Sequence, residues 1–434
     1  MIDAWISLPI AVRYGLLAVL GLLMGAVANH LIYRRCYFPR PIGPWGPADE
    51  KAGPRRWMDY VPVLGWLALR RQVSVHGKGF WIRPLLIEVA LAVSLPLLYD
   101  WYVVSGMLVP EELRAPASLA KLEALMSGIY AFHLILLLLM VAATFIDFDE
   151  YTIPDILTVP GTIIALVCAA IWWELFIPVV YVSFPDGTPK TVALTWFTLP
   201  YAPDPSWWSA RGLRVAMGIW TMWCFALSNR RVILRHGWLK AVAYFMASLV
   251  RRSAWKRLLG IWVAGLIGIS YVYSLGPGNL HWLGLLNSLI GLAVGGGIVW
   301  LIRIVGSLSL RKEAMGFGDV TLMAMIGAFI GWQGATMAFF LSPFAALLVV
   351  LVHLVLVGNK PLPFGPYLCV ATLLTILAWP IMVGEWFIPT LGVMASLLIW
   401  LFLALLGMMG VMLFFYRLIG DALYARHTQQ SEHE

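Results

Sequence analysis

The sequence contains few charged residues and few cysteines for its length. Only 12% of its 434 residues are Asp, Glu, Lys or Arg, whereas 61% are hydrophobic. This composition excludes an ordinary soluble domain, in which about 25% of the residues are charged. The four cysteines, at positions 36, 168, 224 and 369, form no CxxC pair. The sequence therefore predicts neither a disulfide framework nor a zinc site.

A cleavable secretory signal is also lacking. The first segment, MIDAWISLPIAVRYG, has no basic start and no clear small-residue cleavage site. The first apolar run is therefore expected to stay in the protein as a helix. No internal repeat or low-complexity tract stands out.

Long apolar runs such as LLAVLGLLMGAVANHLIY and HLILLLLMVAATF are long enough to cross a bilayer. They predict an all-α polytopic membrane protein with about 11 transmembrane helices. The predicted spans are residues 11–33, 84–104, 128–146, 156–182, 211–227, 258–275, 282–304, 320–340, 343–357, 366–386 and 391–416. Only the segment SPF divides 320–340 from 343–357, and residues 236–250 are predicted as an interfacial helix.

The positive charge is concentrated in two segments. Residues 34–83 hold ten Lys or Arg, and residues 228–257 hold eight with no acid, whereas residues 105–128 carry little positive charge. The positive-inside rule places the first two segments in the cytoplasm and the third outside. The N-terminus is then outside and the C-terminal tail cytoplasmic. Nucleic acid is a poor explanation for these charges, because both basic segments adjoin membrane spans.

Two acidic clusters fall at cytoplasmic helix junctions. Asp319 follows the segment GFG just where a long apolar run begins, and four acids occur in FIDFDEYTIPDIL, residues 145–157. A charged side chain within a membrane helix costs about 2.5–3.5 kcal/mol on insertion scales, so its presence calls for a use. The topology offers one carboxylate from each junction at the same membrane depth.

Two carboxylates in a restricted space can share one proton, so that one activates a water and the other donates to a carbonyl. Gly316 and Gly318 would allow a turn and the close approach of a substrate backbone. The alternative is structural: an acid at a span end is often solvated or paired with Arg. Asp149 and Glu150 could be solvated junction charges, and Asp155 a helix N-terminal charge after Pro154.

Several motifs together carry a family resemblance. DFDEYTIPD followed much later by GFGD resembles the type IV prepilin peptidases, which are membrane aspartic proteases of the GxGD type. In the order of that family come also GLLMGAVANHLIYRR, YVPVLGWLALRRQ, RPLLIEVALA and LPFGPYLCVA. The resemblance covers most of residues 15–185 and 260–385.

The resemblance implies that Asp147 and Asp319 are the catalytic pair of an aspartic endopeptidase. Asp147 is favoured over Asp149 because it stands eight positions before Asp155 of the IPD motif. The implied reaction removes a short basic leader from pilin-like precursors at the cytoplasmic membrane face, without a cofactor. The implied supporting or substrate-contacting residues are Gly316, Gly318, Asp149, Pro154, Asp155, Pro363, Phe364, Gly365 and Glu88.

The family often also methylates the new N-terminus with S-adenosylmethionine. Glu88 stands where the family has a glutamate in this N-terminal region, which makes it a candidate residue for that activity. The structural alternative is an intramembrane acid paired with Arg83 or Arg70.

The sequence departs from the family in three places. The first cytoplasmic loop lacks paired cysteines, so no zinc is expected. Residues 184–257 resemble an insertion of two spans, which keeps both aspartates on one side. A further span has no counterpart. The predicted organisation is an N-terminal region 1–125 with loop 34–83, a peptidase core 126–183 and 258–386, the insertion 184–257, and a C-terminal span and tail 387–434.

Two other functions stay open. One is a GxGD protease with a different membrane substrate, and the other is a catalytically silent scaffold of a pilus or secretion machine. A transporter is disfavoured, because there is no inverted repeat. The expected partners are pilin-like precursors and the lipid bilayer, with no nucleic acid, and the oligomeric state stays open.

Overall fold

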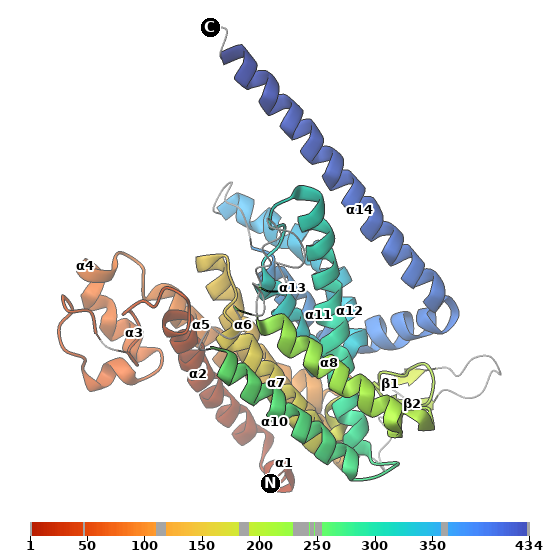
Figure 1. Ribbon diagram of the computed structural model, residues 1–434. Coiled ribbons are helices and arrows are strands. Elements are labelled where there is room, and N and C mark those ends of the chain that lie inside the picture. Colours follow the sequence, from red (N-terminus) through yellow and green to blue (C-terminus); the bar gives the residue numbers. More distant parts are fainter. Residues whose placement is uncertain are drawn as a thin grey trace.

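The computed structural model describes residues 2–46, 48–109, 119–181, 191–228, 254–356 and 363–431, together with residues 243 and 247. Almost all of this part is helical (Figure 1). Seven of the described helical stretches are long and apolar enough to cross a membrane: Ile10–Arg34, Ile82–Val104, Lys121–Glu150, Trp255–Ser274, Leu280–Leu310, Phe317–Leu347 and Pro380–Asp421. The predicted fold class, an all-α polytopic membrane protein, is confirmed.

The N-terminal region consists of a helix pair and a lobe between its two members. After α1 (Ile2–Ile6), helix α2 (Ile10–Arg34) packs along α5 (Ile82–Tyr99), which continues into a π-helical turn at Asp100–Val104. A Cβ on Gly21 or Gly25 of α2 would collide with the backbone of α5, so these glycines permit the close packing that membrane helices favour. The lobe contains η1 (Trp57–Tyr60), α3 (Leu64–Leu69), η2 (Arg70–Gln72) and α4 (Val73–His76).

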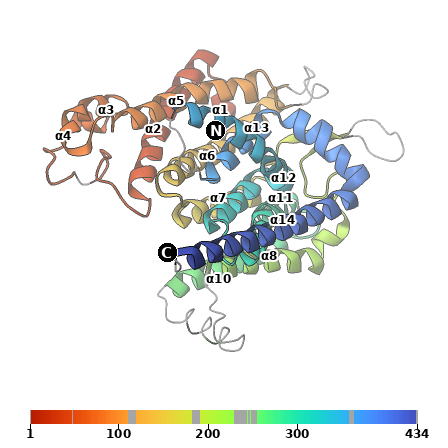
Figure 2. The same ribbon diagram turned by 90° about the horizontal axis from the view of Figure 1, so that it is seen from above.

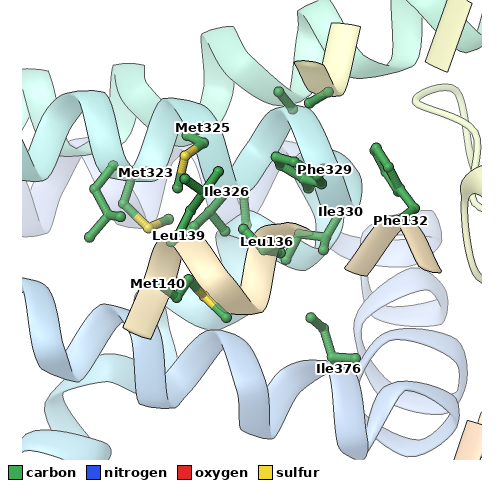
Figure 3. Packing of buried hydrophobic residues seen from close by; sticks show 14 of the residues in the cluster. Phe132, Leu136, Leu139, Met140, Met323, Met325, Ile326, Phe329, Ile330 and Ile376 are labelled. Atoms are coloured by element: carbon green, nitrogen blue, oxygen red, sulfur yellow. The ribbon is translucent and has the colours of Figure 1, made fainter. Parts of the chain in front are cut away.

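The central bundle is built from α6 (Leu119–Glu150), α7 (Asp155–Ile171), α11 (Leu280–Leu310), α12 (Phe317–Leu356) and α13 (Gly365–Leu377). Helices α11 and α12 approach so closely that a Cβ on Gly291 would collide with the carbonyl of Gly327. Figure 3 shows the core beside them, where α6, α12 and α13 contribute Phe132, Leu136, Leu139, Met140, Met323, Met325, Ile326, Phe329, Ile330 and Ile376.

Helix α12 changes direction at Gly331, whose dihedral angles (φ 74°, ψ 170°) are not helical. Met323 O and the Ala335 side chain both lie against the same residue, Gly295. In a straight helix, these two residues would be about 18 Å apart at 1.5 Å per residue. The predicted division at SPF, residues 342–344, was therefore wrong: the turn comes earlier, where a glycine can adopt a positive φ.

The predicted span 156–182 was also too long. Helix α7 ends at Ile171, and the chain continues through η6 (Trp173–Leu175) into strand β1 (Pro178–Tyr181). Strand β1 pairs antiparallel with β2 (Thr191–Leu194), Pro178 lying opposite Leu194. Pro178 cannot donate a backbone hydrogen bond, which disfavours helix at this point.

The segment after β2 enters the bundle. The carbonyls of Thr195, Trp196 and Phe197 accept hydrogen bonds from the side chains of Asn287 (2.8 Å), Gln333 (2.7 Å) and Trp332 (2.9 Å) respectively. This segment is therefore built into the core at the end where α12 turns. Behind it come η7 (Pro205–Trp208), α8 (Ala210–Ser228) and α10 (Ala254–Ser274), the two helices packing together. Apart from residues 243 and 247, the predicted interfacial helix 236–250 lies outside the described residues.

The C-terminal part leaves the bundle as a long helical stretch that is kinked at Met394 (φ −125°, ψ 18°). The predicted span 366–386 ends as helix α13 at Leu377, followed by a π-helical segment, Pro380–Phe387. Helix α14 (Ile388–Ser431) then extends well beyond the predicted 391–416 and projects past the other helices in Figure 1, whereas Figure 2 shows it from above, crossing over the molecule. It crosses the end of α11, where Arg417 Nη1 donates to Ser309 O at 2.8 Å.

Candidate active site

Asp147 lies in the last turn of α6 and is only 4% exposed. The helix ends at Glu150, because the next residue, Tyr151, adopts a positive φ of 54°. The Tyr151 N–H still donates to Asp147 O at 2.9 Å. The Asp147 carboxylate accepts a hydrogen bond from Gly365 N, the first residue of α13, at 3.1 Å. A carboxylate at a helix N-terminus is stabilised by the helix dipole.

Asp319 lies in the first turn of α12 and is 9% exposed. The approach from α11 is fixed by Arg303, whose Nε donates to Met315 O at 2.9 Å and whose guanidinium lies over the Phe317 ring at 5.5 Å. The GFGD turn is thereby tied to α11. No residue in the described part of the chain donates a hydrogen bond to the Asp319 carboxylate.

The structure brings the two aspartates together. Asp147 and Asp319 lie near each other, and the Cys369 thiol of α13 lies near both. Cys369 also bonds the Thr144 side chain, one turn before Asp147. The end of α6 and the starts of α12 and α13 thus meet around two carboxylates that are largely screened from solvent.

Ile153 fills the space between these three helix ends. It is 3% exposed and lies in the short junction between α6 and α7. A Cβ on Gly318 would be 2.9 Å from Ile153 Cβ and from Ile153 O, and a Cβ on Gly365 would be 2.7 Å from Ile153 Cδ1 and 2.6 Å from Asp147 Oδ2. Gly318 and Gly365 are therefore required by close packing. Gly316 differs, because its nearest neighbour, Asp319 Oδ2, would be 3.7 Å away.

The remaining predicted residues of these segments frame the junctions. Pro154 is the residue that precedes α7, and Asp155 is its first residue, the position predicted for a helix N-terminal charge. Pro363 is buried, and Phe364 O accepts from Tyr367 N at 3.1 Å in the turn that begins α13.

The two acids after Asp147 are not free junction charges. Asp149 accepts two hydrogen bonds from Arg83, each 2.7 Å long, and lies 3.4 Å from Arg40. Glu150 accepts from the backbone N–H groups of Tyr37 and Phe38, both at 2.9 Å. The interpretation of these acids as solvated charges was therefore wrong. They attach the N-terminal lobe to the end of α6.

Glu88 lies apart from the aspartates, at the contact between α2, α5 and α3. Its carboxylate is 1% exposed and accepts from Val63 N (2.5 Å), Trp66 Nε1 (2.8 Å) and Asn29 Nδ2 (3.1 Å). The alternative pairing with Arg83 or Arg70 was wrong, because Arg83 binds Asp149 and Arg70 lies over the Trp81 ring. These three bonds hold Glu88 at the contact between the helices, and its part in methylation stays a prediction.

Sequence reasoning missed Ile153, Cys369 and the Arg83–Asp149 pair. An apolar side chain and a lone cysteine carry no signal of a site in a chain that is mostly apolar. Among the residues that the structure describes, no three His, Cys, Asp or Glu side chains gather closely enough to hold a metal ion.

Comparison with known proteins points to one family. Residues 256–351 match the type IV leader peptidase family, a range that includes Asp319 but not Asp147. Three bacterial relatives named prepilin leader peptidase/N-methyltransferase are similar over short stretches. The protein of Aeromonas salmonicida is 33% identical over 109 residues, which is 24% of this chain and 37% of the relative.

The protein of Pseudomonas putida is 36% identical over 100 residues, 22% of this chain and 34% of the relative. The protein of Pseudomonas aeruginosa is 36% identical over 110 residues, which is 21% of this chain and 37% of the relative. The matches thus span little more than a third of each relative. No solved structure matches the chain. The family match and the relatives that share its name support the type IV leader peptidase family for this chain.

Proposed function

We propose that the chain is a membrane aspartic endopeptidase that cleaves the basic leader of pilin-like precursors. The observation that carries the proposal is the pairing of two buried aspartates from distant segments, Asp147 and Asp319, at one end of the helix bundle. The names of the relatives support the substrate class, and the apolar helices support a multi-pass protein of the cytoplasmic membrane.

The proposed chemistry needs one water and one shared proton. Two screened carboxylates that interact are held at lower cost with one proton between them than with two negative charges. The ionised carboxylate accepts a proton from the attacking water, and the protonated one donates to the carbonyl oxygen of the scissile bond. Gly365 N keeps Asp147 Oδ2 in place, so the other oxygen of that residue is left for the water.

The orientation follows from the distribution of Lys and Arg. Both aspartates belong to junctions that the positive-inside rule assigns to the cytoplasm, with the N-terminus outside and the C-terminus inside. A leader that is basic and cytoplasmic would meet the site from this side. Asp149 and Glu150 are already engaged by the lobe, so we propose that they act on the leader through the lobe position instead of through direct contact.

A cleavage assay tests the proposal. Purified protein in lipid is incubated with a pilin-like precursor, and the wild type is compared with Asp147→Asn and Asp319→Asn. Each variant should lose cleavage while remaining folded, because an amide cannot accept the proton of the water. Glu313→Gln is the matched control, since Glu313 belongs to the same junction as Asp319 but its side chain is 67% exposed. Normal cleavage by both aspartate variants would refute the aspartic mechanism, and an inactive wild type would favour a silent scaffold.

A further inference from the structure

The lobe between α2 and α5 exposes an apolar surface. Trp57 and Tyr60 share one face of η1 and are 73% and 41% exposed, and Leu64 and Leu67 share one face of α3 and are 57% and 46% exposed. The opposite side of α3 is buried, with Trp66 at 1% and Leu69 at 0%. A short amphipathic segment with aromatic and aliphatic residues on its open face is typical of elements that lie in a membrane interface.

The depth of this surface follows from the hydrogen bonds of Glu88. Val63 N, directly before α3, and Trp66 Nε1, within it, both donate to the Glu88 carboxylate. Helix α5 begins at Ile82, so Glu88 lies about 9 Å along a span, at 1.5 Å per residue. The start of α3 therefore lies beside the second turn of a transmembrane helix. If the span begins near Ile82, Leu64 and Leu67 would stand at the level where lipid headgroups give way to acyl chains.

The lobe also lies where lipid is expected. In Figures 1 and 2, its helices α3 and α4 stand to the side of α2 and α5, beyond the outline of the bundle, and not over its end. An element in that place, at that depth, faces the surrounding bilayer.

Charge identifies the kind of surface that the lobe fits. Residues 34–83 contain ten Lys or Arg against three acids, and Arg56 and Arg70, which flank η1 and α3, are exposed. A basic surface repels a basic leader peptide and attracts the anionic lipids of a cytoplasmic leaflet. The combination of aromatic rings with flanking arginines favours lipid over a peptide as the partner.

We propose that residues 57–69 form an interfacial membrane anchor, in which Trp57, Tyr60, Leu64 and Leu67 enter the headgroup–acyl boundary of an anionic leaflet. Arg56 and Arg70 would then lie at the level of the lipid phosphates. The same lobe is held at the end of α6 by Glu150, which accepts from Phe38 N, and by Asp149, which lies 3.4 Å from Arg40. The anchor thereby sets the height of the junction that carries Asp147 relative to the membrane surface.

Quenching by brominated lipids tests the anchor. The full chain, with its four cysteines replaced by serine, receives one new cysteine, either Leu64→Cys or Ser74→Cys, and an environment-sensitive fluorophore is attached. Ser74 is the matched control, because it is also exposed on the lobe but belongs to α4. In nanodiscs of brominated lipid, the probe at position 64 should lose more than about half of its emission, as expected for residues immersed in the interface. The probe at position 74 should be quenched mainly by aqueous iodide.

Two outcomes would overturn the proposal. One is a probe at position 64 that iodide quenches and brominated lipid does not, which would leave the surface free for a protein partner. The other is equal quenching at both positions. A second measurement uses the Leu67→Gln variant, labelled at position 64 and compared with the labelled parent in nanodiscs with and without anionic lipid. Quenching by brominated lipid should be weaker in the Leu67→Gln variant than in the parent, and weaker in neutral than in anionic lipid. No change in either comparison would show that the lobe does not bind the membrane through this surface. Helical circular dichroism verifies that each labelled chain is folded.

Discussion

Glu88 and the Asp147–Asp319 pair are buried carboxylates of the same molecule in opposite situations. Glu88 has three N–H donors for its two oxygens. Asp147 has one donor, Gly365 N, and none reaches Asp319 from the described part of the chain. Buried polar groups are nearly always hydrogen-bonded, so an exception calls for an explanation. Satisfied bonds explain Glu88 as a structural residue, whereas the free lone pairs of the aspartates are available to a water and a substrate.

A substitution at Gly365 should have the largest effect on the Asp147–Asp319 pair. In Gly365→Ala, the new Cβ would lie 2.6 Å from Asp147 Oδ2 and must displace the carboxylate. A catalytic group misplaced by about 1 Å can cost about 100-fold in rate, so we expect a loss of about that size. Initial rates of precursor cleavage by the folded variant measure it.

Gly316→Ala is the matched control for Gly365→Ala. Its Cβ would be 3.7 Å from Asp319 Oδ2, an ordinary contact, and the residue has no positive φ. Its activity should stay close to that of the wild type. Equal losses in the two variants would show that displacement of Asp147 does not explain the effect at Gly365.

Glu88→Gln should show the reverse pattern, a loss of stability without loss of turnover. The amide NH₂ would face one of the N–H donors that now binds the carboxylate, leaving a buried donor unsatisfied. We expect the free energy of unfolding to fall by about 1–3 kcal/mol. Thermal unfolding in lipid measures this, and the cleavage rate per folded molecule should be unchanged. A variant that is stable but inactive would instead place Glu88 in the catalytic machinery.

The sequence allowed a prediction for the two aspartates but not for the hydrogen-bond partners of Glu88. The sequence carries a signal for the aspartates, because motif spacing and span parity predict them at one membrane face. Their catalytic role stays a proposal. The partners of Glu88 could not be predicted, because two of its three donors are a backbone N–H and an indole N–H, which every segment of this Trp-rich chain offers. The arginine that seemed available to it, Arg83, binds Asp149 instead.

The ends of helices were also hard to predict from the sequence. Hydropathy predicted an all-α membrane protein but not the turn at Gly331, because apolar residues continue on both sides of it without a charged residue to mark the loop. The helix from residue 156 was extended too far for the same reason, since the aromatic and aliphatic residues around Pro178 suit a buried strand as well as a span.

Removal of the Arg83–Asp149 ion pair should have a smaller effect on cleavage. Asp149→Asn removes a bidentate ion pair that ties the start of α5 to α6, two residues after Asp147. Because the pair is partly exposed, it should contribute about 1 kcal/mol or less. We expect a cleavage efficiency reduced by about fivefold at most, mainly through KM, and partial retention in Asp149→Glu. A complete loss of activity in Asp149→Asn would move the catalytic assignment within this junction.

Asp59 extends the comparison to a carboxylate outside the membrane spans, with the smallest expected effect. Burial disfavours its charged form, but two hydrogen bonds from Arg71 and one from Arg56 N outweigh this, so the pKa of Asp59 lies below its ordinary value of 3.8. A lowered folded-state pKa contributes stability above the unfolded pKa, and this is lost as the pH falls through the folded one. Hydrogen exchange in η1 and α3 should therefore accelerate only below about pH 4. In Asp59→Asn this acid-dependent step should disappear, and its persistence there would assign the acid sensitivity of the lobe to another group.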